Sequence, residues 1–273
     1  MKEFRGTLLR SICAGAAIAL GGTVFLACEN KVAGAFLFSV GLLTVLVFGF
    51  DLFTGKACNE AFIKKPQKLA LIWLGNLIGA VLFGLAVSTH ANLFSAAQTV
   101  VAAKLAKPFY IVIIDAVICE FCIAIGVRGY AKAEGFGKYL AVVLGVMVFI
   151  LCGAEHVVAD MFYLAAARAS DFADILLFLL WATIGNTLGG IVWWLAERGT
   201  APTASYKGFF TKQNIYRLST YIFVKQGVLR RACLVLFKVQ HFFDGPTVIF
   251  VDKFNIMPYY CNKKETRGFF FDI

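Results

Sequence analysis

Two ionisable residues, Glu155 and His156, stand side by side inside a strongly apolar stretch, residues 139–167. An apolar stretch of this length is long enough to cross a lipid bilayer. Ionisable side chains at membrane depth are costly, and they usually face the interior of a helix bundle or a water-filled path. The pair therefore indicates a functional site inside a membrane protein, and we interpret that protein as a channel.

The composition agrees with a membrane protein and excludes several other classes. Of the 273 residues, 60% are hydrophobic and 15% are charged, whereas soluble domains have about 45–50% apolar and about 25% charged residues. The net charge of +10 is concentrated after residue 198, so we expect no nucleic-acid partner. The eight cysteines are scattered, mostly in apolar runs, which favours reduced thiols packed as small apolar groups. Because the Cys-x-x-Cys spacing at 119–122 has no second ligand pair, we expect no metal and no cofactor.

Six membrane-spanning segments are predicted, at residues 11–28, 33–50, 69–87, 109–127, 139–167 and 175–196. Residues 51–56 interrupt the second segment before an apolar piece that runs to Phe62, and residues 153–160 break the fifth. Residues 88–107 are predicted to form a polar loop. Lys and Arg gather at the N-terminus and after the second, fourth and sixth segments. Such a distribution puts both termini in the cytoplasm, with the protein in the cell (inner) membrane.

An internal repeat relates the two halves of this all-α membrane fold. Residues 74–81 (LGNLIGAV) are similar to residues 184–191 (IGNTLGGI), and the interruption at residues 49–52 corresponds to that at 153–156. Three spans per copy is an odd number, so the second copy enters the membrane from the opposite side. Two inverted three-helix repeats with helices 2 and 5 broken are therefore predicted, and paired broken helices indicate a transport site.

These motifs together resemble the formate/nitrite transporter family. The resemblance covers residues 5–198 and rests on residues 52–55 (LFTG), residues 155–161 (EHVVADM) and the two Gly-Asn-x-x-Gly helices. It implies an aquaporin-like six-helix protomer, assembled as a homopentamer in the lipid bilayer, with one pore per protomer for a small monovalent anion such as formate, nitrite or hydrosulfide. The chain departs from the family pattern at Ala154, where the family has Phe, and at Asp160, where it has Asn. The carboxylate of Glu120 is a third departure.

The domain organisation follows from these boundaries. Residues 1–198 are predicted to be the transmembrane channel domain. Residues 199–273 form a basic, aromatic tail that we expect to be cytoplasmic and poorly ordered; the alternative is an amphipathic segment lying on anionic lipid.

His156 is the central candidate for the substrate pathway. Its neutral imidazole can donate a hydrogen bond to a small anion or pass it a proton, which makes a neutral acid that crosses an apolar constriction at lower cost. The alternative is a buried histidine that bonds only a neighbouring carbonyl. Thr54 is expected to bond substrate or else its own loop, and Lys56 to draw anions or else to contact lipid. The apolar part of the pathway is assigned to Leu52, Phe53 and Phe149. The alternative for Phe149 is an aromatic ring that faces lipid or packs in the core.

Five further residues are expected to support the broken helices. Glu155 is expected to accept backbone N–H groups freed at the break, and Gly55 to supply backbone freedom. The remaining three are Gly153, Asn76 and Asn186.

Three other functions remain open. An aquaporin-like channel for water or a neutral solute is one alternative, although its usual Asn-Pro-Ala loops are absent. A membrane enzyme that uses Glu155 and His156 would need a nucleophile or metal-ligand set, and none is visible, so we expect no enzyme. A structural membrane protein that does not transport is the last alternative.

Overall fold

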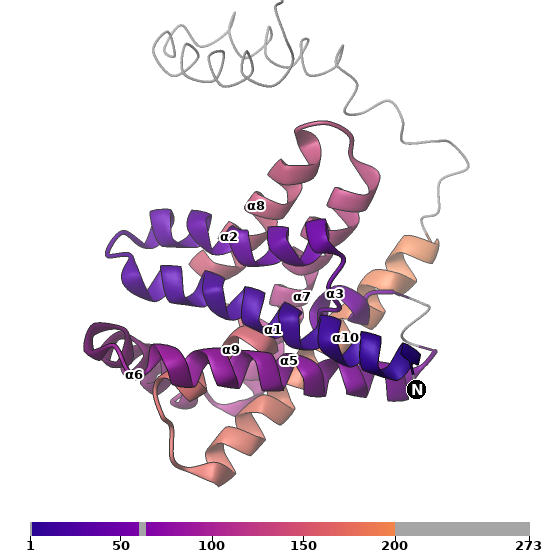
Figure 1. Ribbon diagram of the computed structural model, residues 1–273. Helices are drawn as coiled ribbons and strands as arrows, with labels where there is room; N and C mark the ends of the chain where they lie inside the picture. The colour runs from indigo at the N-terminus through magenta and orange to yellow at the C-terminus, as the bar shows by residue number, and fades with distance from the viewer. Residues whose placement is uncertain (1, 60–63, 200–273) are drawn as a thin grey trace, which may run out of the picture. The chain divides into compact units, whose positions relative to one another are not determined.

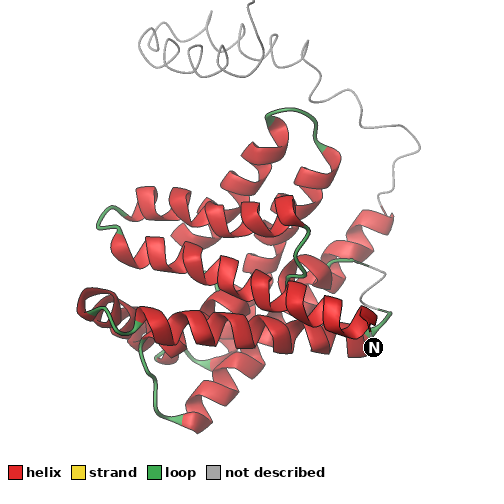
Figure 2. Ribbon diagram, in the orientation of Figure 1, coloured by secondary structure: helices red, strands yellow, loops and turns green. Residues whose placement is uncertain are grey.

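The computed structural model describes residues 2–59 and 64–199, and Figure 2 shows that this part of the chain consists of helices joined by loops. In chain order the described helices are α1 (Lys2–Ala27), α2 (Lys31–Phe48), α3 (Phe53–Ala57), α5 (Pro66–Val87), α6 (Ala91–Leu105), α7 (Phe109–Lys132), α8 (Gly137–Leu151), α9 (Val157–Ala166) and α10 (Phe172–Gly199).

Five of the described helices, α1, α2, α5, α7 and α10, are long and apolar enough to cross a membrane, whereas α8 and α9 are shorter apolar helices. Large apolar side chains lie on their outer surfaces; Phe48 is 69% exposed and Leu82 is 63% exposed. Such surfaces are suited to lipid, because a helix satisfies its backbone hydrogen bonds internally.

The two halves of the described chain pack in the same way. Helix α1 packs against α2 and α5, and helix α7 packs against α8 and α10; Figure 1 shows α1 lying between α2 and α5. Glycines permit the close approach of α5 to α1 and of α10 to α7. A Cβ atom on Gly79 would lie 2.0 Å from the carbonyl oxygen of Ile12, and one on Gly189 would lie 2.9 Å from that of Val117. Small residues at helix crossings are typical of membrane bundles.

Two helices end inside the bundle and a new helix begins a few residues later. Helix α2 ends at Phe48 and α3 begins at Phe53, while α8 ends at Leu151 and α9 begins at Val157. The glycine after each ending, Gly49 or Gly153, has a left-handed backbone, with φ of 67° and 66°. Glycine adopts this conformation without steric cost and commonly terminates helices.

The structure differs from the sequence-based prediction at several boundaries. Residues 88–107 were predicted as a polar loop, and this is wrong, because residues 91–105 form α6. This segment is rich in good helix formers such as alanine, but it is too polar to be recognised as a span. Within the predicted interruption at 51–56, residues from Phe53 onward already belong to α3. The first helix begins at Lys2 rather than at residue 11.

Two parts of the prediction lie outside the described residues. The tail from residue 200 to residue 273 is one, and residues 60–63, which include the predicted apolar end at Phe62, are the other.

Candidate functional site

The first turns of α3 and α9 meet at a hydrogen bond between Thr54 and His156. The Thr54 Oγ1 atom lies 2.9 Å from the His156 Nε2 atom, and the bond is buried. His156 is the N-cap of α9, and its Nδ1 atom accepts the backbone N–H of Ala159 at 3.1 Å. Thr54 and His156 were both predicted to touch substrate, and the fold brings them into contact from distant parts of the sequence.

This geometry specifies the tautomer of His156. Because Nδ1 accepts a backbone N–H, the proton of the neutral ring resides on Nε2 and is donated to Thr54 Oγ1. The hydroxyl proton of Thr54 then remains available for another acceptor. A charged imidazolium would instead place an N–H on Nδ1 against the N–H of Ala159, at the positive end of α9. The fold therefore favours a neutral histidine that acts as a hydrogen-bond donor.

Aromatic rings pack around this bond. The Phe149 ring stacks on the His156 ring, with centroids 5.6 Å apart and planes at 21°. Phe149 also meets Phe38 edge to face, at 5.8 Å. Leu52 and Phe53, which precede Thr54, are 1% and 3% exposed. An apolar shell of this kind excludes water and strengthens the hydrogen bonds inside it.

Asn76 ties the gap between α2 and α3 to the helices beside it. Its Oδ1 atom accepts the backbone N–H of Phe53 at 2.8 Å, and its Nδ2 atom donates to the carbonyls of Asp51 at 2.9 Å and Ser11 at 2.7 Å. The N–H of Phe53 and the carbonyl of Asp51 lie at the gap between two helices, where backbone groups have no partner within a helix. Ser11, in contrast, lies inside α1. One buried amide thus satisfies both groups at the gap.

Asn186 does the same for the gap between α8 and α9. Its Oδ1 atom accepts the backbone N–H of Val157 at 3.0 Å, and its Nδ2 atom donates to the carbonyls of Glu155 at 3.1 Å and Ala116 at 2.7 Å. The two asparagines of the repeated motif therefore make matching sets of bonds.

The carboxylate of Glu155 contacts two lysines. Its Oε1 atom lies 2.7 Å from Nζ of Lys107, and its Oε2 atom contacts Nζ of Lys104. We expected backbone N–H groups as its partners, but the N–H groups of Val157 and Ala159 are bonded by Asn186 and His156. A fully buried carboxylate requires compensating charge, and these two ammonium groups supply it.

Both lysines have further acidic partners. Lys104 Nζ lies 2.8 Å from Asp160 Oδ1, and Lys107 Nζ lies 2.6 Å from Asp115 Oδ2. Burial alone lowers the pKa of Lys104, but Asp160 and Glu155 outweigh burial and raise it above its usual value. The pKa of Lys107 is likewise raised, because its bonds to Asp115 and Glu155 outweigh burial. Both lysines therefore stay charged at neutral pH.

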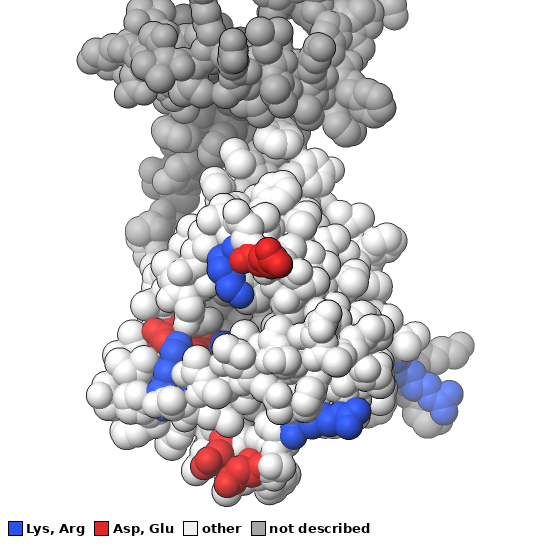
Figure 3. Space-filling view, turned by 90° about the vertical axis from the view of Figure 1, so that its left-hand side faces the viewer, with Lys and Arg blue, Asp and Glu red and all other residues white. Residues whose placement is uncertain are grey.

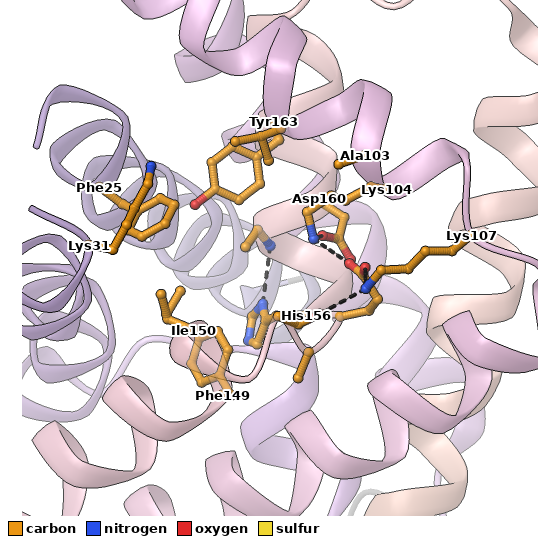
Figure 4. A pocket seen from close by; sticks show the side chains of 15 residues that line it. Phe25, Lys31, Ala103, Lys104, Lys107, Phe149, Ile150, His156, Asp160 and Tyr163 are labelled. Carbon is orange, nitrogen blue, oxygen red and sulfur yellow. Dashed lines mark hydrogen bonds and ion pairs between the residues drawn. The ribbon is translucent and has the colours of Figure 1, made fainter. Parts of the chain in front are cut away.

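His156, the two lysines, Glu155 and Asp160 line a cavity of about 300 Å³. Figure 4 shows Lys104, Lys107 and Asp160 together on one side of it, and Phe25 and Lys31 on the other, with His156 and Phe149 between them. Thr54 is not among the lining residues. An anion in this cavity would therefore meet His156 before Thr54.

The other predicted pathway and support residues lie apart from the cavity or act differently. Lys56 Nζ lies 3.3 Å from Asp51 Oδ1 and does not line the cavity. Gly55 lies inside α3 rather than in a loop, and a Cβ on it would stand 3.3 Å from a methyl group of Val127. Gly55 therefore provides space rather than backbone freedom. Gly153 has the left-handed backbone already described and lines the cavity.

Sequence reasoning missed Lys104, Lys107 and Asp115 as site residues. One signal was available in the sequence. The loops opposite the Lys- and Arg-rich segments carry few lysines, and Lys104 and Lys107 are two of these few and lie close together. Glu120, which stood out in the sequence, is fully buried on α7, and its oxygens have no hydrogen-bond partner among the described residues. It does not line the cavity and packs near Gly189 of α10.

Charge on the surface is sparse. Figure 3 shows a mostly uncharged face of the molecule, on which charged side chains lie in small groups, some with basic and acidic atoms side by side.

Comparisons with known proteins agree on one family. A family model described as formate/nitrite transporter matches residues 1–196. The nitrite transporter NirC of Escherichia coli (strain K12) is 28% identical over 233 residues, which cover 73% of this chain and 87% of NirC. A solved FNT family ion channel is similar with a TM-score of 0.65 and 28% identity, covering 72% of this chain and 90% of that one. A solved pentameric formate channel with formate bound is similar with a TM-score of 0.64 and 21% identity, covering 73% of this chain and 98% of that one.

Proposed function

The chain belongs to the formate/nitrite transporter family and is a multi-pass membrane protein, and we propose that it is a channel for small monovalent weak-acid anions such as formate, nitrite or hydrosulfide. The observation that carries this proposal is the buried bond between His156 and Thr54, adjoining a cavity with three lysines in its lining. The same anions are weak acids, so each has a neutral form.

The chemistry of the site suits an anion rather than a cation. The Nε2–H of His156 and the hydroxyl of Thr54 both donate hydrogen bonds, and the N-terminal end of α9 adds a positive partial charge. A small anion that moves from the cavity toward Thr54 exchanges water for these donors. Crossing the apolar part beside Phe149 is cheaper for the neutral acid than for the bare anion.

We further infer that helices 2 and 5 are broken helices of two inverted repeats in an aquaporin-like fold. The pairs α2–α3 and α8–α9 each count as one crossing, which gives six crossings with α1, α5, α7 and α10. Matching bonds of Asn76 and Asn186 support the repeat, as do the matching left-handed glycines Gly49 and Gly153. Paired broken helices at a repeat interface are a frequent site of transport.

The membrane setting follows from the same proposal. We place the protein in the cell (inner) membrane with both termini in the cytoplasm. Lys and Arg gather at the N-terminus and after the second, fourth and sixth segments, and such residues are enriched on the cytoplasmic side. A homopentamer with one pore per protomer is supported by the likeness to a pentameric formate channel. Residues 1–198 would form the channel and residues 199–273 a cytoplasmic extension.

Flux measurements in proteoliposomes test this function. Formate, nitrite, hydrosulfide, glycerol and water are compared in vesicles with and without the protein. We expect protein-dependent flux of at least one anion, and the ranking of the three names the substrate. Flux of water or glycerol without anion flux would support the aquaporin-like alternative. A folded protein that passes none of them would support a structural role.

A further inference from the structure

The charged groups at the cavity are unevenly matched. Lys104 and Lys107 contact three carboxylates, those of Glu155, Asp160 and Asp115. Glu155 has an ammonium at each oxygen, and Asp115 adjoins Lys107. Asp160 has one oxygen 2.8 Å from Lys104, while its Oδ2 atom has no hydrogen-bond partner among the described residues.

Because of this imbalance, protonation relieves more unfavourable charge at Asp160 than at Glu155 or Asp115. Its side chain is 1% exposed, so the charge has little access to water. The two lysines balance Glu155 and Asp115, and an ionised Asp160 then adds one uncompensated negative charge. Two carboxylates that share one ammonium also repel each other, which favours protonation of one of them.

Asp160 stands directly on the route to His156. It lies one helical turn further along α9, and its backbone N–H donates to the His156 carbonyl at 2.9 Å. Both residues line the same cavity. An anion that approaches His156 therefore comes within Coulomb range of the Asp160 carboxyl group.

The titratable and charged groups that face Asp160 come from several elements. They are Lys31 at the start of α2, Lys104 of α6, Lys107 after it, Cys119 and Asp115 of α7, Glu155 and His156 between α8 and α9, and Tyr163 of α9. Lys104 and Lys107 stay charged, as argued above, so carboxyl protonation sets the charge of the group around them. Lys104, Lys107, Glu155, Asp115 and Asp160 together carry −1 when Asp160 is ionised and are neutral when it is protonated. Lys31, on the other side of the cavity, adds one positive charge in both states.

We propose that Asp160 makes anion uptake through this pore depend on pH, because its carboxylate repels anions from the cavity and its protonated form does not. The inference rests on the proposed channel function and adds to it a residue that the family pattern lacks. It assigns to Asp160 the control of anion occupancy in the cavity, separate from the donor function of His156 and Thr54.

Asp160→Asn tests the inference, because asparagine has nearly the same shape and no charge. Formate flux is measured in proteoliposomes from about pH 5 to pH 8 for the native protein and the variant. The ratio of the two fluxes is compared at each pH, since the titration of formate itself cancels in that ratio. We expect a ratio near one at acid pH and on the order of thirtyfold at alkaline pH, for charges roughly 8 Å apart at an effective dielectric constant of about 20.

Two further variants complete the test. Asp174→Asn, on an exposed residue at the start of α10, is the matched control and should leave the flux ratio at one throughout. Lys104→Gln removes a positive charge from Asp160 and should shift the pH dependence of the flux to higher pH, and it can be measured even where Asp160→Asn fails to fold.

The outcomes separate the two proposals. A ratio for Asp160→Asn that is the same at every pH, or an unshifted pH dependence in Lys104→Gln, would overturn the control by Asp160 and leave the channel standing. No flux of formate, nitrite or hydrosulfide in the folded native protein and in Asp160→Asn would overturn the channel function together with this inference.

Discussion

Replacing His156 by asparagine or by alanine separates the two functions of this residue. Nδ1 caps helix α9 through the N–H of Ala159, and Nε2 donates to Thr54. Asparagine is among the best N-cap residues, so its side-chain oxygen can replace Nδ1, but it has no atom at the position of Nε2. Alanine loses both contacts. We therefore expect both variants to lose anion flux and only alanine to lose the cap as well.

The magnitudes follow from the contacts. Loss of the bond to Thr54 leaves a buried hydroxyl unsatisfied, which costs about 1–3 kcal/mol of stability in both variants. Loss of the N-cap adds about 1 kcal/mol in His156→Ala. A donor to an anion contributes about 1.5–3 kcal/mol, so flux should fall by roughly tenfold to a hundredfold in both variants.

Flux of formate and nitrite into proteoliposomes and thermal unfolding in detergent are measured for both variants. His90→Gln is the control, because His90 is exposed before α6 and makes no side-chain cap bond, so this change should alter neither quantity. Native flux in a folded His156→Asn protein would refute the donor function of Nε2. Equal stability of the asparagine and alanine variants would refute the cap.

Three other predictions concern the site and the helix packing around it. Thr54→Val keeps the shape but removes the hydroxyl, so anion flux should fall about tenfold or more; native flux would contradict a direct contact of Thr54 with substrate. Asn186→Leu removes three buried hydrogen bonds and should lower the free energy of unfolding by about 3 kcal/mol or more; chemical unfolding measures this, and a change under 1 kcal/mol would contradict it. Gly79→Ala would place a Cβ 2.0 Å from a backbone oxygen and should destabilise the protein more than Gly153→Ala, which meets open space and costs about 1–2 kcal/mol for its backbone conformation. Thermal unfolding of the two glycine variants compares them, and the reverse order would refute the packing argument.

The sequence was sufficient for the two helix interruptions and for their asparagines. In each interruption a glycine, Gly49 or Gly153, lies four residues before the first residue of the next helix. This local pattern can be read from the sequence because it occurs twice. The sequence was not sufficient for α6, since this helix of 15 residues is too short for a span, is rich in alanine and is flanked by polar residues. Nor could it give Lys104 and Lys107 as partners of Glu155, because they lie about fifty residues away and only tertiary packing joins them.

The repeat itself argues that His156 and Asp160 are present for function. At the first gap, Asp51 is held by Arg10 at 2.8 Å and by Lys56 at 3.3 Å, and at the second gap Glu155 is held by Lys104 and Lys107. Each gap therefore has one carboxylate between two cations, so the buried charges of Asp51 and Glu155 are both compensated.

The residue that caps the following helix differs between the copies. It is Leu52 before α3, with no side-chain cap bond, and His156 before α9. Because α3 begins without a polar cap, the fold does not require an imidazole at the corresponding position of α9. Asp160 likewise adds a charge to a cluster that is balanced without it, which costs stability in a buried setting. Residues that the repeat does not need for folding, and that are costly to bury, are those that we expect to serve the proposed function.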